Sequence, residues 1–162
     1  MTGGMGTAET TITLNGAEVT GRAPADTTLV RWLREQAHAY EVKEGCNEGT
    51  CGTCTVLVDG RAATGCTTLA VQVDGAAVET SASLADGEEL SPLQAKFWET
   101  GAAQCGFCTQ GMLMSAVELL RSGVEVTPAV VREHLHGNLC RCTGYQAIVD
   151  AVVDAAAEGA TR

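Results

Sequence analysis

The residues best suited to chemistry in this chain of 162 residues are its eight cysteines, which fall into two sets of four. The first set has the spacing Cys-x4-Cys-x2-Cys with a more distant fourth member, and the second has two close pairs separated by 31 residues. The members are Cys46, Cys51, Cys54 and Cys66 in the first set, and Cys105, Cys108, Cys140 and Cys142 in the second. Three cysteines at x4 and x2 spacing with a distant fourth are the plant-type pattern of a [2Fe-2S] cluster. The predicted chemistry is therefore iron-sulfur cluster binding, with no cysteine left over.

Glycines accompany the cysteines of the first loop, which reads EGCNEGTCGTC over residues 44–54. Because glycine lacks a Cβ, its backbone can adopt positive φ and approach closely, so that N–H groups point at sulfur atoms and stabilise their negative charge. The loop is therefore predicted to wrap a small inorganic core.

Other uses of paired cysteines fit this spacing less well. Zinc loops usually open with Cys-x2-4-Cys knuckles, so three thiolates within nine residues favour a cluster, whereas the second set taken alone leaves zinc open. A thioredoxin-like pair at Cys105 and Cys108 would leave Cys140 and Cys142 unused. Disulfides need an oxidising compartment, and residues 1–8 have neither the basic nor the apolar region of a secretory signal. A cytoplasmic protein is expected.

Composition limits the partners. With 20 acidic and 10 basic side chains the formal net charge is −10, which argues against nucleic acid and anionic membrane surfaces. No run approaches the roughly 18 apolar residues of a membrane span. Neither a Ser-His-Asp set nor a phosphate-cradling loop nor a nucleotide fingerprint is present, so the chain is expected to have no substrate chemistry of its own.

The elements that must position the first set are strands and tight turns. Residues 3–7 are expected to be a disordered tail. Alternating residues predict a strand over 10–14, and Asn15-Gly16 predicts a type I′ turn into a second strand. A short helix is expected over 28–37, with Asp26 as its cap.

A second hairpin is predicted after the cysteine loop. Residues 55–58 are β-branched and apolar, and Asp59-Gly60 supplies a turn into a segment that ends at Cys66. Hairpins, one helix and a cysteine loop together predict a β-grasp, plant-type [2Fe-2S] ferredoxin-like domain over residues 8–83.

The second half changes to a helical period. Ser91-Pro92 and Thr127-Pro128 have the residue types of an N-cap followed by the first helical position. Four helices with cysteines in the loops between them predict a small bundle that holds its cluster at one end. This predicts an α+β chain with a four-helix-bundle [2Fe-2S] domain over residues 84–162 and a linker over 83–90. The expected helices are 91–101, 109–122, 127–136 and 145–157.

Three strings carry a family resemblance: GCNEGTCGTCTV at 45–56, QCGFCT at 104–109 and GNLCRCTGY at 137–145. In this order they resemble the iron-sulfur subunit of the molybdenum hydroxylases, the xanthine oxidase and carbon monoxide dehydrogenase family. The resemblance covers roughly residues 10–158. One departure is Gln110, where the family often has proline at the helix start, and little functional consequence is expected from it.

The resemblance implies an electron-transfer subunit of an oxidoreductase complex. Family members oxidise a substrate at a molybdenum-pterin centre in a large subunit and pass electrons through two [2Fe-2S] clusters to FAD in a medium subunit. The cluster of the second cysteine set would lie beside the pterin, and that of the first set would face the flavin. By the same resemblance Gln104 and Cys142 would hydrogen-bond the pterin. A dimer of heterotrimers is implied, and the substrate is not, since its contacts lie in the large subunit.

A second class of function remains open, a free-standing two-cluster ferredoxin. A diffusing ferredoxin needs only the first 80 or so residues, so the second half favours the subunit. Only His38, His134 and His136 could supply imidazole, and His134 and His136, at a helix end, are interpreted as exposed polar residues rather than ligands. A Rieske-type centre would need two histidine ligands, but eight cysteines already fill both clusters. Trp32 and Trp98 are interpreted as packing or subunit-interface residues.

Overall fold

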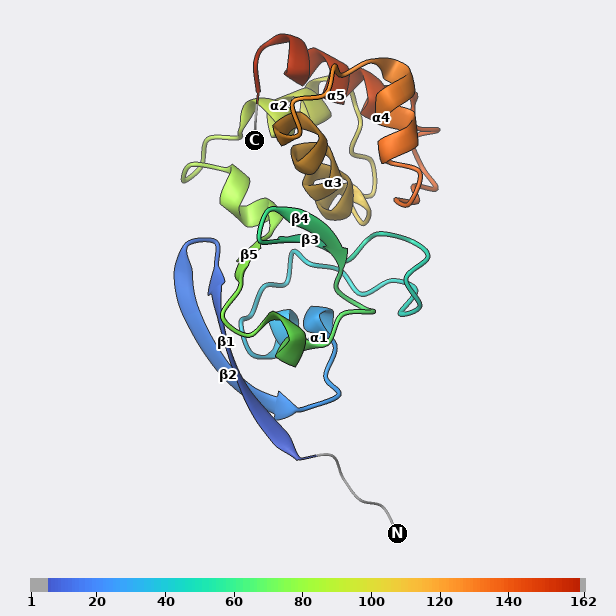
Figure 1. The fold of residues 1–162 in the computed structure, drawn as a ribbon. Coiled ribbons are helices and arrows are strands. Elements are labelled where there is room, and N and C mark those ends of the chain that lie inside the picture. The colour runs from blue at the N-terminus through green and yellow to red at the C-terminus, as the bar shows by residue number, and fades with distance from the viewer. Residues whose placement is uncertain (1–5, 161–162) are drawn as a thin grey trace.

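The strands and the first α-helix gather at one end of the molecule, and the four later α-helices gather at the other (Figure 1). The computed structural model describes residues 6–160. All five strands and the first α-helix lie before residue 80, and four further α-helices lie after residue 90. None of the helices in these described residues is both long and apolar enough to cross a bilayer.

Two hairpins form the edges of a five-stranded sheet with the order β2-β1-β5-β3-β4. The hairpins are β1 (Thr7–Leu14) with β2 (Ala17–Pro24), and β3 (Thr55–Val58) with β4 (Arg61–Thr64). Strand β5 (Ala77–Glu79) joins them, parallel to β1 and antiparallel to β3.

The tight turns of the two hairpins are those predicted. Both central residues have positive φ, 51° and 88° at Asn15-Gly16 and 48° and 78° at Asp59-Gly60, as a type I′ turn requires. Strand β1 begins at Thr7, so the disordered tail predicted over residues 3–7 is wrong at its last residue. Residues 1–5 lie outside the described residues.

Helix α1 (Leu29–Glu35) packs on the sheet and is shorter than expected. The predicted cap at Asp26 is wrong. The N-cap is Thr28, and its side chain makes no capping hydrogen bond. The loop after β4 takes over this role, because the carbonyls of Thr68 and Gly65 accept from the N–H groups of Leu29 and Val30 at 2.7 and 2.9 Å.

The four later helices begin close to where the sequence predicts. They are α2 (Pro92–Glu99), α3 (Thr109–Arg121), α4 (Pro128–His134) and α5 (Gln146–Ala157). The hydroxyl oxygens of Ser91 and Thr127 accept N-cap hydrogen bonds at 3.3 Å from Gln94 and Val130. These two predicted caps are confirmed.

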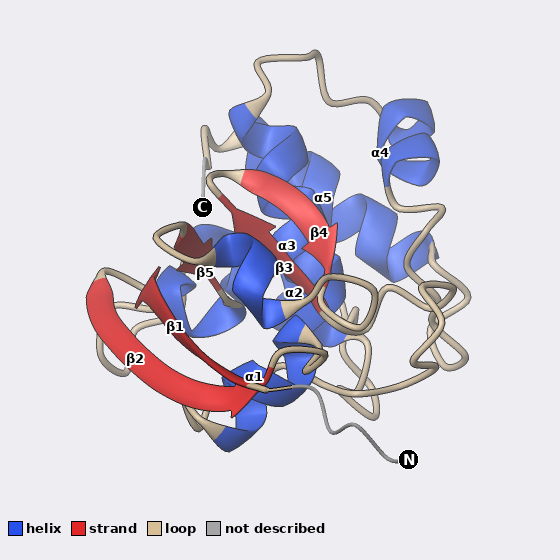
Figure 2. Ribbon diagram, turned by 60° about the horizontal axis from the view of Figure 1, so that its bottom comes forward, coloured by secondary structure: helices blue, strands red, loops and turns tan. Residues whose placement is uncertain are grey.

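Strand β3 joins the two halves because its alternate side chains enter two different cores. Val56 packs with α1 and the sheet, whereas Leu57 packs with the later helices. Helix α3 lies against β3 and β4, an arrangement visible in Figure 2.

The segment 83–90 is not a free linker. Leu84, at the end of the 3-10 helix η2 (Ser81–Leu84), is buried in the helical core, and the backbones of Asp86 and Glu89 pair at 3.0 Å. The halves are therefore packed against each other.

Candidate metal centres

The structure brings the four cysteines of the first set together. Cys46 and Cys51 lie in the loop between α1 and β3, Cys54 precedes β3, and Cys66 follows β4. Antiparallel pairing of Thr55 with Thr64 places Cys54 beside Cys66, whose N–H donates to the Cys54 sulfur at 3.4 Å. Cys51 acts to lower the pKa of Cys46, so these two side chains are neighbours.

The first loop turns its backbone N–H groups toward sulfur, as its glycines predict. Gly49 and Gly52 have φ of 79° and 68°. The N–H groups of Glu48 and Thr50 point at the Cys46 sulfur, at 3.5 and 3.3 Å. The hydrogen bond from the Glu48 N–H, and to a smaller extent the one from Thr50, lowers the pKa of Cys46 to about 5. A thiolate is therefore stabilised there before any iron binds.

The second set forms a similar group at the starts of two helices. Cys105 and Cys108 precede α3, and Cys140 and Cys142 precede α5. The sulfurs of Cys105 and Cys142 are 3.5 Å apart, and Cys140 acts to raise the pKa of Cys108, so these two side chains are also neighbours. The four sulfurs thus lie as two pairs.

Tyr145 and Thr143 hold the last cysteine loop. The Tyr145 hydroxyl accepts from the Cys140 N–H at 2.9 Å and donates to the Asn138 carbonyl at 3.3 Å. The Thr143 hydroxyl donates to the Cys140 sulfur at 3.2 Å. Burial acts to raise the pKa of Cys140, but the hydrogen bonds from Thr143 and from the backbone outweigh it and the net shift is downward. The loop therefore presents a stabilised thiolate.

Each set combines a stabilised thiolate with a thiol that resists ionisation. Burial raises the pKa of Cys54 and of Cys108 to about 12, and the hydrogen bond that the Cys142 thiol donates to the Cys105 sulfur raises the pKa of Cys142. Thiols of this kind ionise when a metal supplies compensating charge. All eight cysteines are free thiols, so they are available as ligands.

The pairing of the sulfurs suits a two-iron core. In a [2Fe-2S] cluster each iron takes two protein ligands, and each set offers two pairs of thiols. A single zinc ion instead needs its four ligands about one point at roughly 2.3 Å. The donor set fits the cluster, and the ligand assignment stays a prediction.

Gln104 and Cys142, the residues predicted to meet a pterin, lie at one open surface. Both are exposed, and Gln104 is the chain neighbour of Cys105, whose sulfur contacts that of Cys142. Phe107 is exposed beside them in sequence. The structure therefore leaves this edge of the second centre accessible to a partner.

Gln110 is the clearest residue that sequence reasoning undervalued. Its side chain is only 5% exposed, and its Nε2 donates to the carbonyls of Thr53 and Thr55 at 3.3 and 2.7 Å. These two carbonyls flank Cys54. The expectation that Gln110 would have little functional consequence did not include this contact. Gln110 lies 57 positions from Thr53 and 55 positions from Thr55 along the chain, so local sequence patterns do not show it.

The two cysteine loops meet at a junction formed by residues 51–55, 110–115 and 137–139, called the cluster junction below. The Leu139 N–H donates to the Cys51 carbonyl at 2.9 Å. Asn138 Nδ2 donates to the Gly52 carbonyl at 3.0 Å, and Asn138 Oδ1 accepts from the Ser115 hydroxyl at 2.8 Å. One signal in the sequence could have pointed here, since a glycine within a predicted helix, Gly111, usually has a packing reason.

His134 and the two tryptophans differ in their contacts and exposure. His134 pairs with Glu118 at 3.2 Å, so it is not free as a ligand. Trp32 is buried in the sheet core, whereas Trp98 is 79% exposed on α2. Trp32 is thus a packing residue, and Trp98 is left for a partner surface.

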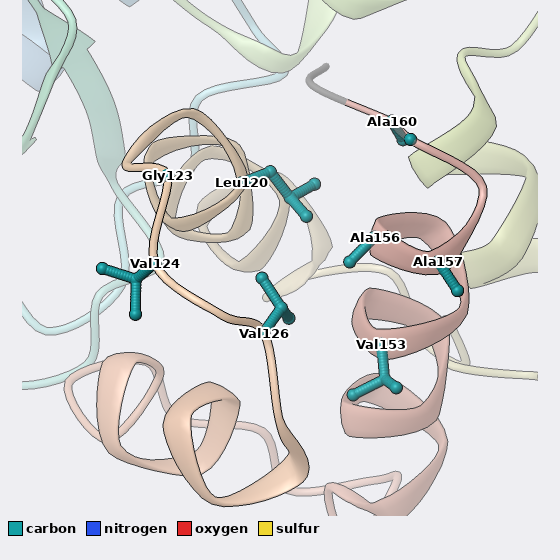
Figure 3. Close-up of a pocket in the computed structure, with 9 residues that line it drawn as sticks. Leu120, Gly123, Val124, Val126, Val153, Ala156, Ala157 and Ala160 are labelled. Atoms are coloured by element: carbon teal, nitrogen blue, oxygen red, sulfur yellow. The ribbon is translucent and has the colours of Figure 1, made fainter.

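A hollow of about 410 Å³ lies between the end of α3 and α5 (Figure 3). Small apolar side chains line it, among them Leu120, Val126 and Val153, and no cysteine or titratable residue does. It therefore carries no sign of chemistry and lies outside both cysteine sets.

Two family descriptions match the chain, "2Fe-2S iron-sulfur cluster binding domain" over residues 12–95 and "[2Fe-2S] binding domain" over residues 80–153. Among similar proteins, the nicotine 6-hydroxylase small subunit of Paenarthrobacter nicotinovorans is 50% identical over 147 residues, covering 91% of this chain and 88% of the relative. The xanthine dehydrogenase iron-sulfur-binding subunit of Escherichia coli O157:H7 is 44% identical, covering 88% and 90%. A chain of quinoline 2-oxidoreductase from Pseudomonas putida 86 superposes with a TM-score of 0.88 at 41% identity, covering 94% and 98%.

Proposed function

The chain belongs to the iron-sulfur subunits of the molybdenum hydroxylase family, and we propose that it relays electrons from a molybdenum-pterin centre in a large subunit, through two [2Fe-2S] clusters, to FAD in a medium subunit. The clusters, when bound, supply reversible one-electron transfer. The chain contributes the thiolates, their spacing and the surface that meets each partner.

The contact between the two cysteine loops carries the proposal. The Leu139 N–H···O=C Cys51 hydrogen bond of 2.9 Å joins a neighbour of Cys140 to a residue of the first set. A relay needs its centres close together and held at a fixed separation.

The proposed order of transfer is the one that the family resemblance implies, and the exposure of the cysteines agrees with it. Cys105 and Cys142 are exposed, with Gln104 beside them, so the second cluster is the one placed to receive electrons from a pterin that hydrogen-bonds Gln104 and Cys142. In the first set Cys54 and Cys66 are buried and Cys46 and Cys51 are half-buried. Their side of the loop would face the flavin.

The proposed domains are a β-grasp unit over 8–83 and a four-helix bundle over 84–162. The complex would be a cytoplasmic dimer of heterotrimers. Exposed large apolar side chains on the helical half support a partner surface, since they are costly to leave in water. They are Leu90, Trp98, Phe107, Val124 and Leu139.

Isolation of the native complex through a tag on this chain tests the proposal. Two larger chains, molybdenum and FAD are expected to co-purify in fixed ratio. A red two-cluster protein without them would indicate a free-standing ferredoxin. A colourless zinc protein would contradict both functions.

A further inference from the structure

Gly111 lies where helix α3 touches the first cysteine loop most closely. A Cβ built on Gly111 would lie 2.1 Å from the carbonyl oxygen of Gly52 and 3.2 Å from the carbonyl carbon of Thr53. Both neighbours are backbone atoms, and they lie between Cys51 and Cys54. A larger residue at position 111 would therefore have to push this loop away from the helix.

Gln110 holds the same loop from the other direction. Its Nε2 donates to the carbonyls on either side of Cys54, and its own backbone is two residues from Cys108. The Gln110 side chain thus links the start of α3, two residues after Cys108, to the backbone on both sides of Cys54. Its Oε1 is buried and has no hydrogen-bond partner among the described residues, so the side chain keeps its place through these two bonds.

Gly52 completes the close packing of the cluster junction. A Cβ on Gly52 would lie 2.5 Å from the Gly137 carbonyl oxygen and 2.9 Å from the Asn138 Cα. The loop that carries Cys51 and Cys54 is therefore held between α3 on one side and the segment before Cys140 on the other.

We propose that Gln110 and Gly111 are positioning residues that set the separation of the two clusters, Gly111 by allowing close approach and Gln110 by holding the loop there. The inference rests on the proposed relay function. In each transfer one electron leaves the reduced second cluster and enters the oxidised first cluster, without bond making or proton movement in the chain. Loosening the junction would slow this step while leaving all eight ligands in place.

The holoprotein, reduced fully with dithionite, provides the test. Two paramagnetic clusters split each other's EPR lines by an amount that falls steeply with their separation. The variants are Gly111→Ala, Gln110→Met and, as matched control, Gly137→Ala, because a Cβ at Gly137 meets nothing within 4 Å although this residue lies in the same junction. Iron per chain is measured alongside the splitting.

Gly111→Ala is expected to reduce or abolish the splitting at parental iron content. Alanine favours helix over glycine, so a loss of helix is not the cause. Gln110→Met is expected to reduce the splitting less, and Gly137→Ala to match the parent. Parental splitting in Gly111→Ala, an equal loss in Gly137→Ala, or a parent without splitting would overturn the inference.

If Gly111→Ala loses iron, Gln110→Met decides, because it removes the two hydrogen bonds without adding bulk near the loop backbone. Parental splitting in Gln110→Met then overturns the inference. Dithionite reduces the clusters without molybdenum, so the outcome is separate from that of the relay proposal. Absence of partner subunits would refute the relay and leave the splitting comparison intact.

Discussion

Asn138 is expected to be the most sensitive polar residue of the cluster junction. Asn138 is 6% exposed and Ser115 is 5% exposed. The Asn138 side chain accepts a hydrogen bond from the Ser115 hydroxyl and donates one to the Gly52 carbonyl. Asn138→Ala removes these two hydrogen bonds together with a longer one, from Nδ2 to the Thr55 hydroxyl at 3.4 Å. The Gly52 carbonyl keeps its bonds from Thr55, but the Ser115 hydroxyl is left buried without this acceptor.

The expected loss of stability follows from these contacts. Each hydrogen bond contributes about 1 kcal/mol net, and a stranded buried hydroxyl costs about 1–3 kcal/mol. Asn138→Ala should therefore lower the free energy of unfolding by roughly 3–5 kcal/mol. With a urea slope of about 2 kcal/mol per molar, the midpoint falls by about 1.5–2.5 M.

A double-mutant cycle with Ser115→Ala isolates the pair. Ser115→Ala alone leaves Asn138 Oδ1 without its donor, at a cost of about 2 kcal/mol. In the double variant no hydroxyl is stranded, so its loss should be smaller than the sum by about 1 kcal/mol or more. The measurement is urea unfolding of the cluster-loaded chain, followed anaerobically by far-UV circular dichroism. Additivity within about 0.5 kcal/mol would refute the reasoning.

Three further predictions concern the clusters and the pterin edge. Metal analysis of anaerobically prepared protein should give about four iron and four labile sulfides per chain, with two distinct reduced-state EPR signals, and zinc in place of iron would contradict this. Cys51→Ser should impair transfer to flavin while substrate still reduces the second cluster; a block in that reduction, with molybdenum retained, would reverse the proposed order. Gln104→Ala should keep its iron but lose an interaction of roughly 1 kcal/mol with the pterin, seen as weaker pterin retention or slower transfer from molybdenum. Equal turnover and molybdenum occupancy would count against that role.

Short-range features of the chain were predictable from sequence because the residues that make them are neighbours. The x4 and x2 spacing fits a loop around a cluster, and Asn15-Gly16 and Asp59-Gly60 fit type I′ turns whatever surrounds them. Ser91-Pro92 determines a helix start, because the hydroxyl reaches an N–H group only three residues away. The strings around the cysteines were sufficient to identify the family.

The helix start at α1 shows where local reasoning fails. Asp26 has the right residue type for a cap, yet the N–H groups of α1 bond to carbonyls of Gly65 and Thr68, which come from beyond β4. An acceptor supplied by the fold made a side-chain cap unnecessary.

The cluster junction was decided by tertiary structure alone. Gln110 and Asn138 bond to residues 55 to 86 positions away, and the need for glycine at position 111 arises from a carbonyl in another loop. Periodicity and spacing describe a residue's own element, whereas these contacts depend on how α3 crosses β3. Leu57, whose side chain enters the helical core from the sheet, takes part in that packing. The chain thus carries its ligands in local motifs, and only the folded arrangement sets the distance between them.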